Sequence, residues 1–373
     1  MKNRILVLNQ GLSGVNKYIF SQLKNRGWDL TLLEVPFPKK CMLQAMISTL
    51  NPNLMQWKQK AKKKLFQLHK SSWTFLQRTK FCQEKLSKLD GKFDVILQIS
   101  GMFAPTLDYK NLSVPYVTVN DYTMALCKKY PEWASPPSEL ETWLGLEKEL
   151  YENARFIFAA SENTRNSFIN DYGIDGRKVI KVSYGNTLEA TAEFSRNFDN
   201  KIVLFVGKDF ERKGGYILLE SFQKVKQVIE DARLIILGAD KNFLKIRQSG
   251  VEVLGYIKNI NDVKSLYERA SVFVMPSLCE PFGLVFLEAM EYKLPCIGST
   301  VDAIPEIIDD GKTGYLVPIG DATVLADKII TLLTNKNLSM QMGTAGHNLL
   351  KQKFSWDVFG EKMDKCLKEC VDV

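Results

Sequence analysis

The stretch SVFVMPSLCEPFGLVFLEAM, residues 271–290, is the most informative part of the sequence for the fold. Residues 272–275 form an uninterrupted apolar run, which is typical of a strand covered on both faces. A short loop begins at Pro276, and the apolar spacing over 285–292 predicts a helix. A buried strand that leads into a helix is the repeating unit of a parallel α/β sheet, so the stretch predicts that architecture.

The same alternation extends over the whole chain. In the first half we expect strands at 4–8, 29–35, 93–99, 114–119, 155–160 and 178–183, with helices that include 15–26 and 139–153. In the second half we expect strands at 202–206, 233–237, 251–254, 272–275, 295–298 and 315–317, with helices at 216–229, 263–269, 285–292, 323–333 and 338–352. A chain of 373 residues is long enough for two domains. The predicted fold is therefore α/β, with two Rossmann-like domains facing a cleft.

Composition excludes several classes of protein. The apolar run from Ile5 to Leu8 is shorter than the ~7–15 residues of a signal peptide, and no stretch reaches the ~18 apolar residues of a membrane-spanning helix. The seven cysteines are scattered without a CxxC pair, and there are only two histidines, which argues against a zinc site. We therefore expect a cytoplasmic protein that uses no metal or other cofactor.

Two glutamates, Glu280 and Glu288, flank the start of the helix predicted after 272–275. Ligands of open parallel sheets bind beyond the carboxyl ends of the strands, and the free N–H groups of a helix start favour phosphate. Gly283 lets a ligand approach the backbone closely. Two carboxylates at this junction can hold neutral hydroxyls while backbone amides hold phosphates. The alternative is that both glutamates are surface charges stabilised by the helix dipole.

The spacing of Glu280 and Glu288, with Pro-Phe-Gly between them, closely resembles the signature of glycosyltransferase family 4, a retaining family with the GT-B fold. Further segments are similar to the family in the same order: FVGKDFERKG (205–214), LIILG (234–238), VLGY (253–256), GKTGYLVP (311–318) and FSW (354–356). The resemblance implies an acceptor domain over 1–187, a nucleotide-sugar donor domain over 188–353, and a closing helix over 354–373 that packs back toward the first domain.

The resemblance also implies roles for individual residues. Glu288 is expected to bind the ribose hydroxyls of the donor, and Glu280 to act as a catalytic residue that contacts the transferred sugar. Lys213 and Lys208 are expected at the diphosphate. Backbone contacts to the diphosphate are expected from Phe282, Gly283 and Leu284. The implied reaction retains the anomeric configuration, by a same-face displacement in which the leaving phosphate helps to deprotonate the acceptor.

Some positions depart from the family pattern. Lys208 stands where the family usually has arginine, which keeps the charge but loses the bidentate fork, and Arg212 is a candidate to compensate. Asp302 and Ala303 stand where the family often has two glycines. We therefore expect the backbone to approach the donor sugar less closely at this loop.

The first half of the chain offers two further candidates. Gly11 and Gly14 bound a loop that resembles the family's glycine-rich loop, so Gly14 is expected near the donor phosphates. Asn120 replaces a histidine of the family, which leaves Asp121 as the second catalytic candidate. The alternative role of Asp121 is to cap the helix that follows.

Positive charge is concentrated in residues 56–92, which hold eleven Lys and Arg residues and two acidic ones, against a formal net charge of +8 for the chain. Trp57, Phe66 and Trp73 are among five aromatic residues interleaved with these lysines. One interpretation is an anionic membrane surface, which would place the protein peripherally at the inner face of a membrane. Another is a solvated helical pair with its aromatics in the core. Nucleic-acid binding is the third, and we do not expect it.

The sequence thus favours a retaining glycosyltransferase that moves a sugar from a nucleotide-sugar donor to a glycan or lipid-linked acceptor. An epimerase or phosphorylase on a related fold fits less well, because epimerases of this kind often use histidines and a phosphorylase needs a much longer chain. A non-catalytic partner that binds a nucleotide sugar and supports an active glycosyltransferase is the second hypothesis. The departures at Asn120 and Asp302 favour it, and the presence of Glu280 and Glu288 opposes it.

Overall fold

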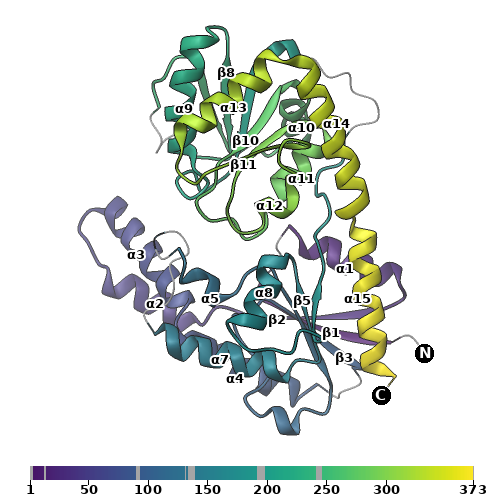
Figure 1. Ribbon diagram of the computed structural model, residues 1–373. Helices are drawn as coiled ribbons and strands as arrows, with labels where there is room; N and C mark the ends of the chain where they lie inside the picture. The colour runs from purple at the N-terminus through teal and green to yellow at the C-terminus, as the bar shows by residue number, and fades with distance from the viewer. Residues whose placement is uncertain are drawn as a thin grey trace. The chain divides into compact units, whose positions relative to one another are not determined.

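The computed structural model describes residues 3–11, 14–89, 93–130, 132, 139–190, 198–240 and 246–372. The chain divides into two compact units, Met1–Val182 with Phe359–Val373, and Ser183–Val358. Each unit contains one six-stranded sheet (Figure 1).

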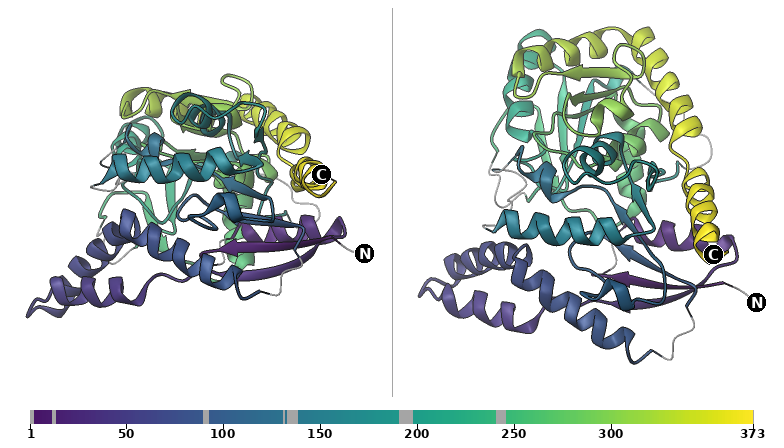
Figure 2. Two further views of the ribbon diagram at one scale, coloured as in Figure 1. Left: turned by 90° about the horizontal axis from the view of Figure 1, so that it is seen from below. Right: turned by 60° about the horizontal axis from the view of Figure 1, so that its bottom comes forward.

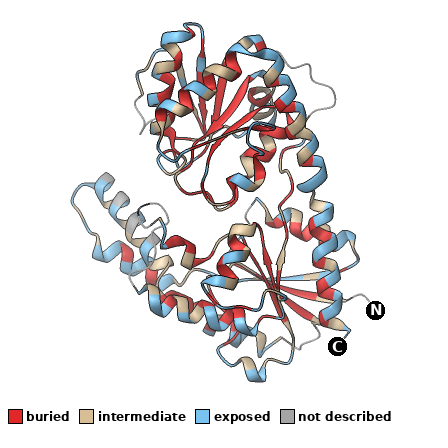
Figure 3. Cartoon of the chain, viewed as in Figure 1, coloured by how far each residue is buried: buried red, intermediate tan, exposed pale blue. Residues whose placement is uncertain are grey.

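The sheet of the first unit consists of β1 (Arg4–Asn9), β2 (Asp29–Glu34), β3 (Val95–Ile99), β4 (Tyr116–Asn120), β5 (Phe156–Ala159) and β6 (Val179–Lys181). The strand order is β2-β1-β3-β4-β5-β6, and all neighbouring strands are parallel. The inner strands are buried along most of their length, whereas β2 at the edge alternates between exposed and partly buried residues (Figure 3). The inner strands are apolar without alternation because both of their faces are covered.

The helices of the first unit are α1 (Asn16–Asn25), α2 (Lys39–Ser48), α3 (Leu54–His69), α4 (Ser72–Leu86), α5 (Met124–Cys127), α7 (Leu140–Asn153), α8 (Glu162–Asn170) and most of α15 (Trp356–Val371), with a 3-10 turn, η1 (Tyr109–Asn111). Helices α2 and α3 pack on each other and extend away from the sheet (Figures 1 and 2). Helix α15 is held to the first unit by Trp28, whose Nε1 donates to Oδ1 of Asp364 at 2.7 Å.

A carboxyl group, Glu147 on α7, is buried in the core of the first unit. It accepts hydrogen bonds from the hydroxyls of Tyr151 and Tyr172 and from the backbone N–H of Met124. Burial nevertheless raises the pKa of Glu147 to about 7, because removing the charged form from water outweighs these donors.

The sheet of the second unit consists of β7 (Ile202–Val206), β8 (Arg233–Leu237), β9 (Val251–Gly255), β10 (Val272–Met275), β11 (Cys296–Ser299) and β12 (Gly314–Val317). The strand order is β12-β11-β10-β7-β8-β9, again with parallel neighbours. This is the Rossmann order, in which the chain reverses its direction of winding between the first and fourth strands. Here those strands are β7 and β10, so the switch point lies between them.

The helices of the second unit are α9 (Gly215–Val228), α10 (Ile260–Arg269), α11 (Leu284–Glu291), α12 (Ile304–Ile307), α13 (Ala322–Thr334) and α14 (Lys336–Lys353), with a 3-10 turn, η2 (Phe198–Asn200). Helix α9 packs beside α13, and α11 packs beside α14 (Figure 1). Helix α13 begins at Asp321, whose carboxylate accepts the N–H groups of Thr323 and Val324. Helices on both faces of the sheet explain why its strands are almost wholly apolar.

The predicted α/β fold with two Rossmann-like domains is confirmed. Every strand expected from the sequence is present, and the named helices begin and end within a few residues of their predicted bounds. Helix α2 was not predicted, because the apolar residues on its exposed face obscure the usual pattern of an amphipathic helix. No helix in the described ranges is both long enough and apolar enough to cross a membrane.

Candidate functional site

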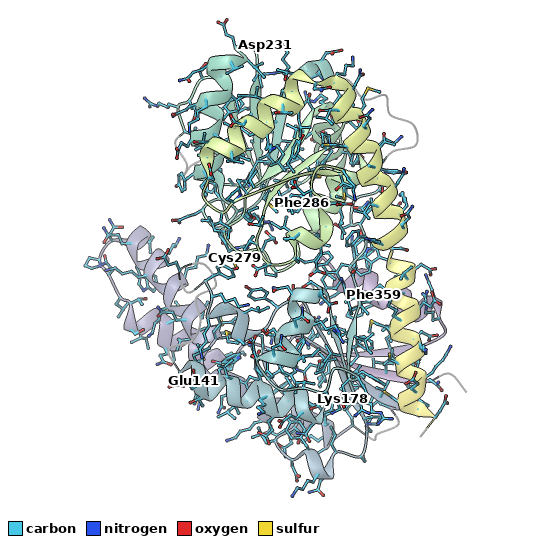
Figure 4. All side chains as sticks on the ribbon, in the orientation of Figure 1. Glu141, Lys178, Asp231, Cys279, Phe286 and Phe359 are labelled. Carbon is cyan, nitrogen blue, oxygen red and sulfur yellow. The ribbon has the colours of Figure 1, made fainter. Side chains whose placement is uncertain are left out.

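The candidate site lies at the switch point of the second sheet. The loop 207–214 leaves the carboxyl end of β7, and the loop 276–283 leaves the carboxyl end of the neighbouring strand β10. Figure 4 labels Cys279 in the second of these loops and Phe286 in the helix α11 that follows it. Parallel α/β sheets bind ligands at such a switch point, beyond the carboxyl ends of the strands.

The two loops pack backbone to backbone at Gly214. This residue has a φ of 73°, and a Cβ placed on it would lie 1.9 Å from the carbonyl oxygen of Pro276. The backbone N–H of Leu278 donates to the carbonyl oxygen of Arg212 at 2.8 Å. Glycine is required at 214 because only a residue without a side chain fits both the backbone conformation and the contact.

This packing brings Glu280 against two cations. Oε2 of Glu280 accepts from Nζ of Lys213 at 3.0 Å and lies 3.8 Å from Nη1 of Arg212. The hydroxyl of Ser277 donates to the same oxygen at 3.3 Å. Glu280 is only 6% exposed, so the pairing compensates a charge that would be costly to bury alone.

Glu288, on α11, lies beside this cluster with both carboxylate oxygens engaged. Oε1 accepts from the hydroxyl of Thr187 at 2.6 Å, and Oε2 accepts from the hydroxyl of Tyr267 at 2.8 Å. Burial raises the pKa of Glu288, and the two hydrogen bonds and the charge of Lys213 oppose that rise. The residue is partly exposed, and a carboxylate has about four acceptor positions, so it retains capacity for further hydroxyl donors.

The N-terminus of α11 completes the site. Gly283, with a φ of 100°, precedes the helix, and no side chain caps it. The first N–H groups of a helix lack the usual partners within it, and here that of Phe286 donates to the carbonyl oxygen of Gly283, so those of Leu284 and Val285 are the ones that suit an anion. Phe282 is buried and its ring packs on that of Tyr184 at 5.1 Å, which fixes the loop that carries these amides, and Leu284 opens the helix.

The structure brings some of the predicted residues together in the second unit. Glu280, Glu288, Lys213 and the segment 282–284 come together, whereas the exposed Lys208 has its ammonium 5.4 Å from the ring of Tyr256. Arg212, named as a candidate to compensate for Lys208, contacts the site directly, because it also donates to the carbonyl oxygen of Cys279.

Gly14 and Asp121 belong to the first unit. Gly14 is exposed in the turn that leads into α1, while Leu12 and Ser13 of the same predicted loop lie outside the described residues. Asp121 is exposed immediately after β4, and its carbonyl oxygen accepts from the hydroxyl of Thr164. Helix α5 is capped by Thr123, so capping of that helix is not the role of Asp121.

Sequence reasoning did not find Thr187 or Tyr267. Tyr267 lies on the buried face of α10, where the sequence pattern indicates only an apolar position. Thr187 lies just before the boundary expected between the domains, and nothing in its neighbourhood distinguishes it. Within the described ranges there is no group of three or more His, Cys, Asp or Glu residues placed to hold a metal ion.

The basic segment 56–92 forms most of α3 and all of α4. Phe75 is buried in the core and Phe81 packs against it, whereas Trp73 is 43% exposed and Nε1 of Trp57 donates to the carbonyl oxygen of Met46 on α2. Only part of the aromatic set therefore faces the core. Asp90 and Lys92, and the side chains of Lys63 and Phe66, lie outside the described residues.

Comparison with known proteins agrees with the resemblance to glycosyltransferases that the sequence of the second unit shows. Residues 200–335 match the family model described as Glycosyl transferases group 1. A phosphatidyl-myo-inositol mannosyltransferase of Mycobacterium leprae is 32% identical over 169 residues, which are 44% of this chain and 45% of that protein. The capsular polysaccharide biosynthesis glycosyltransferase CapM of Staphylococcus aureus is 27% identical over 56% of this chain and 60% of its own length. The matched region thus spans about half the length of these relatives.

A sucrose-phosphate synthase from Thermosynechococcus elongatus has a similar structure, with a TM-score of 0.72 over 99% of each chain and 19% sequence identity. At this identity the likeness is one of fold.

Proposed function

We propose that this chain, which belongs to the family 4 type of GT-B glycosyltransferases, is an enzyme that moves a sugar from a nucleotide-sugar donor to a glycan or lipid-linked acceptor with retention of configuration. The observation that carries the proposal is the cluster of Lys213, Arg212 and Glu280 at the switch point, with Glu288 beside it. The cluster combines cations that can pair with a diphosphate and carboxylates that can accept hydrogen bonds from sugar hydroxyls.

The donor diphosphate would lie between Lys213, Arg212 and the N-terminus of α11. The ammonium of Lys213 and the guanidinium of Arg212 are both held against Glu280 before the reaction, and the backbone N–H groups at the start of α11 would add to them. The bond that breaks is the one between the anomeric carbon and the phosphate oxygen. Negative charge then grows on the leaving diphosphate, and these groups stabilise it.

The carboxylates hold the sugar portions of the donor. Glu288 would accept hydrogen bonds from the ribose hydroxyls, with Thr187 and Tyr267 holding its carboxylate in place. Glu280 would contact the transferred sugar, where its negative charge favours the positive charge that develops at the anomeric carbon. The acceptor hydroxyl forms the new bond on the same face, and its proton passes to the leaving phosphate oxygen. We further propose that the cations and amides make a metal ion unnecessary.

The acceptor class rests on the relatives. One is named for phosphatidyl-myo-inositol and another for capsular polysaccharide, so we include both a lipid-linked molecule and a glycan among the candidates.

An anionic membrane surface is the proposed location of a lipid-linked acceptor. Five residues of α2 and the loop after it, with Leu54 at the start of α3, expose between 45% and 71% of their surface: Met42, Leu43, Met46, Ile47 and Leu50, then Leu54. On α2 the opposite face, with Cys41 and Ala45, is buried. Lysines follow on α3, so an apolar face that can enter the interface adjoins positive charge that attracts anionic headgroups.

Nucleotide release from a panel of UDP-, GDP- and ADP-sugars tests the enzymatic proposal. Release from one donor by the wild type, and its loss in Glu280→Ala, is the expected result. Glu220→Ala, on the exposed surface of α9, is the control and should keep wild-type turnover. Binding of a donor without release under any acceptor condition would favour the non-catalytic partner, and absence of donor binding would contradict the proposal.

Vesicle sedimentation tests the membrane proposal. Vesicles that contain phosphatidylglycerol should retain the protein, and neutral phosphatidylcholine vesicles should not. The double substitution Leu43→Glu and Ile47→Glu should abolish retention. The control is Val228→Glu, because Val228 is similarly exposed but lies at the end of α9. Equal retention of the wild type and the double variant would contradict a role for the α2 face.

A further inference from the structure

A hydrogen bond joins Asp302 to the backbone of Glu280. Oδ2 of Asp302, in the loop between β11 and α12, accepts from the backbone N–H of Glu280 at 2.9 Å. At the end of β11 the buried hydroxyl of Ser299 donates to the carbonyl oxygen of Ser277, in the loop that carries Glu280. The loop that carries Glu280 is thus attached to its neighbour at both ends of the segment 277–280.

The backbone of Asp302 is held in an uncommon conformation. Its φ is 47°, in the left-handed region that glycine adopts without cost and that, among other residues, Asn and Asp adopt most readily. Such a conformation persists only where other contacts maintain it, and it is found most often at functional sites. One contact that helps to maintain it here is the hydrogen bond to Glu280.

We propose that Asp302 is a positioning residue for Glu280, which keeps the Glu280 carboxylate directed at the donor sugar. The inference rests on the proposed function of Glu280. Lys213 and Ser277 hold the carboxylate end of Glu280, and Asp302 holds its backbone end. A side chain that is fixed at both ends loses little conformational entropy when the transition state forms. Such preorganisation lowers the activation free energy.

Two variants separate this role from a merely structural one. Asp302→Gly suits the left-handed backbone and removes the acceptor, whereas Asp302→Asn keeps an acceptor oxygen and still tolerates a positive φ. We expect kcat of the glycine variant to fall roughly tenfold, as for one hydrogen bond worth about 1.4 kcal/mol, with KM changed by less than about threefold. The asparagine variant should recover most of kcat, and the melting temperature of the glycine variant should stay near that of the wild type, because glycine relieves the backbone.

Hydrogen exchange of the peptide 276–284 gives a second readout that does not need turnover. Exchange at Glu280 should be faster in Asp302→Gly and near the wild-type rate in Asp302→Asn. Wild-type kcat in Asp302→Gly, or unchanged exchange in that variant, overturns the inference. Full activity of Glu280→Ala would instead overturn the proposed role of Glu280, and the exchange measurement would still report whether the bond is present.

Discussion

Nζ of Lys213 lies 3.0 Å from Oε2 of Glu280, although the two residues are 67 positions apart in the chain. The residue expected at the diphosphate is therefore also the partner of the carboxylate expected at the sugar. A donor that brings two phosphates to Lys213 competes with Glu280 for the ammonium. Because neither side chain is more than slightly exposed, loss of one partner affects both stability and chemistry.

Lys213→Met should lower kcat/KM by about a hundredfold to a thousandfold, as for loss of one group that stabilises charge in the transition state. It should also lower the free energy of unfolding by about 3 kcal/mol, because Glu280 then keeps the hydroxyl of Ser277 and, as its remaining cation, the more distant Arg212. The double variant Lys213→Met/Glu280→Gln should recover stability and remain inactive. Urea unfolding and steady-state kinetics measure the two effects, and recovery of activity in the double variant would contradict the assigned roles.

Glu288→Gln should weaken binding of the preferred nucleotide by about tenfold, since the amide nitrogen replaces an acceptor of the ribose hydroxyls. The 2′-deoxy nucleotide serves as the probe. Wild-type protein should prefer the ribonucleotide, and the variant should bind the two nearly equally. Calorimetric titration of each pair measures this, and an unchanged preference in the variant would exclude a contact between Glu288 and the ribose.

Gly214→Ala should destabilise the second unit by more than about 2 kcal/mol, because the added Cβ meets the backbone of Pro276 and φ is positive. Gly311→Ala is the matched control: its φ is 74°, but a Cβ there meets nothing within 4 Å. The control should cost only the backbone strain, about 1 kcal/mol. Equal unfolding midpoints in the two variants would show that the contact with Pro276 does not limit stability.

Glu147 should make stability depend on pH. Its pKa of about 7 in the folded protein exceeds the ordinary value of 4.5, so the folded state holds a proton that the unfolded state has lost between these values. Stability contributed by this group is complete below pH 4.5 and declines as pH rises toward 7, by roughly 3 kcal/mol in total.

The wild type should therefore lose stability between pH 4.5 and pH 8, whereas Glu147→Gln should not lose this contribution. Relative to the wild type, the glutamine variant should be more stable at pH 8 than at pH 4.5. Urea titrations at both pH values measure it. A difference that stays constant with pH would show that Glu147 does not titrate in this range.

Much of the fold follows from local sequence. Runs such as 202–206 and 272–275 have no polar position, which is typical of strands covered on both faces, and each is followed by a segment of helical spacing. Helix α2 did not follow from its sequence. Its exposed face is apolar, so the helix lacks the polar outer face that marks an amphipathic helix in a sequence.

The sequence by itself determined the parallel α/β architecture and the strand–loop–helix unit that carries Glu280 and Glu288. These depend on spacing and residue type within a short segment. Only the tertiary structure decided that Arg212 contacts Glu280, that Thr187 and Tyr267 hold Glu288, and that Asp302 accepts the N–H of Glu280. Those contacts join separate segments of the chain, and the ones among Arg212, Glu280 and Asp302 exist because the strand order places β7, β10 and β11 side by side.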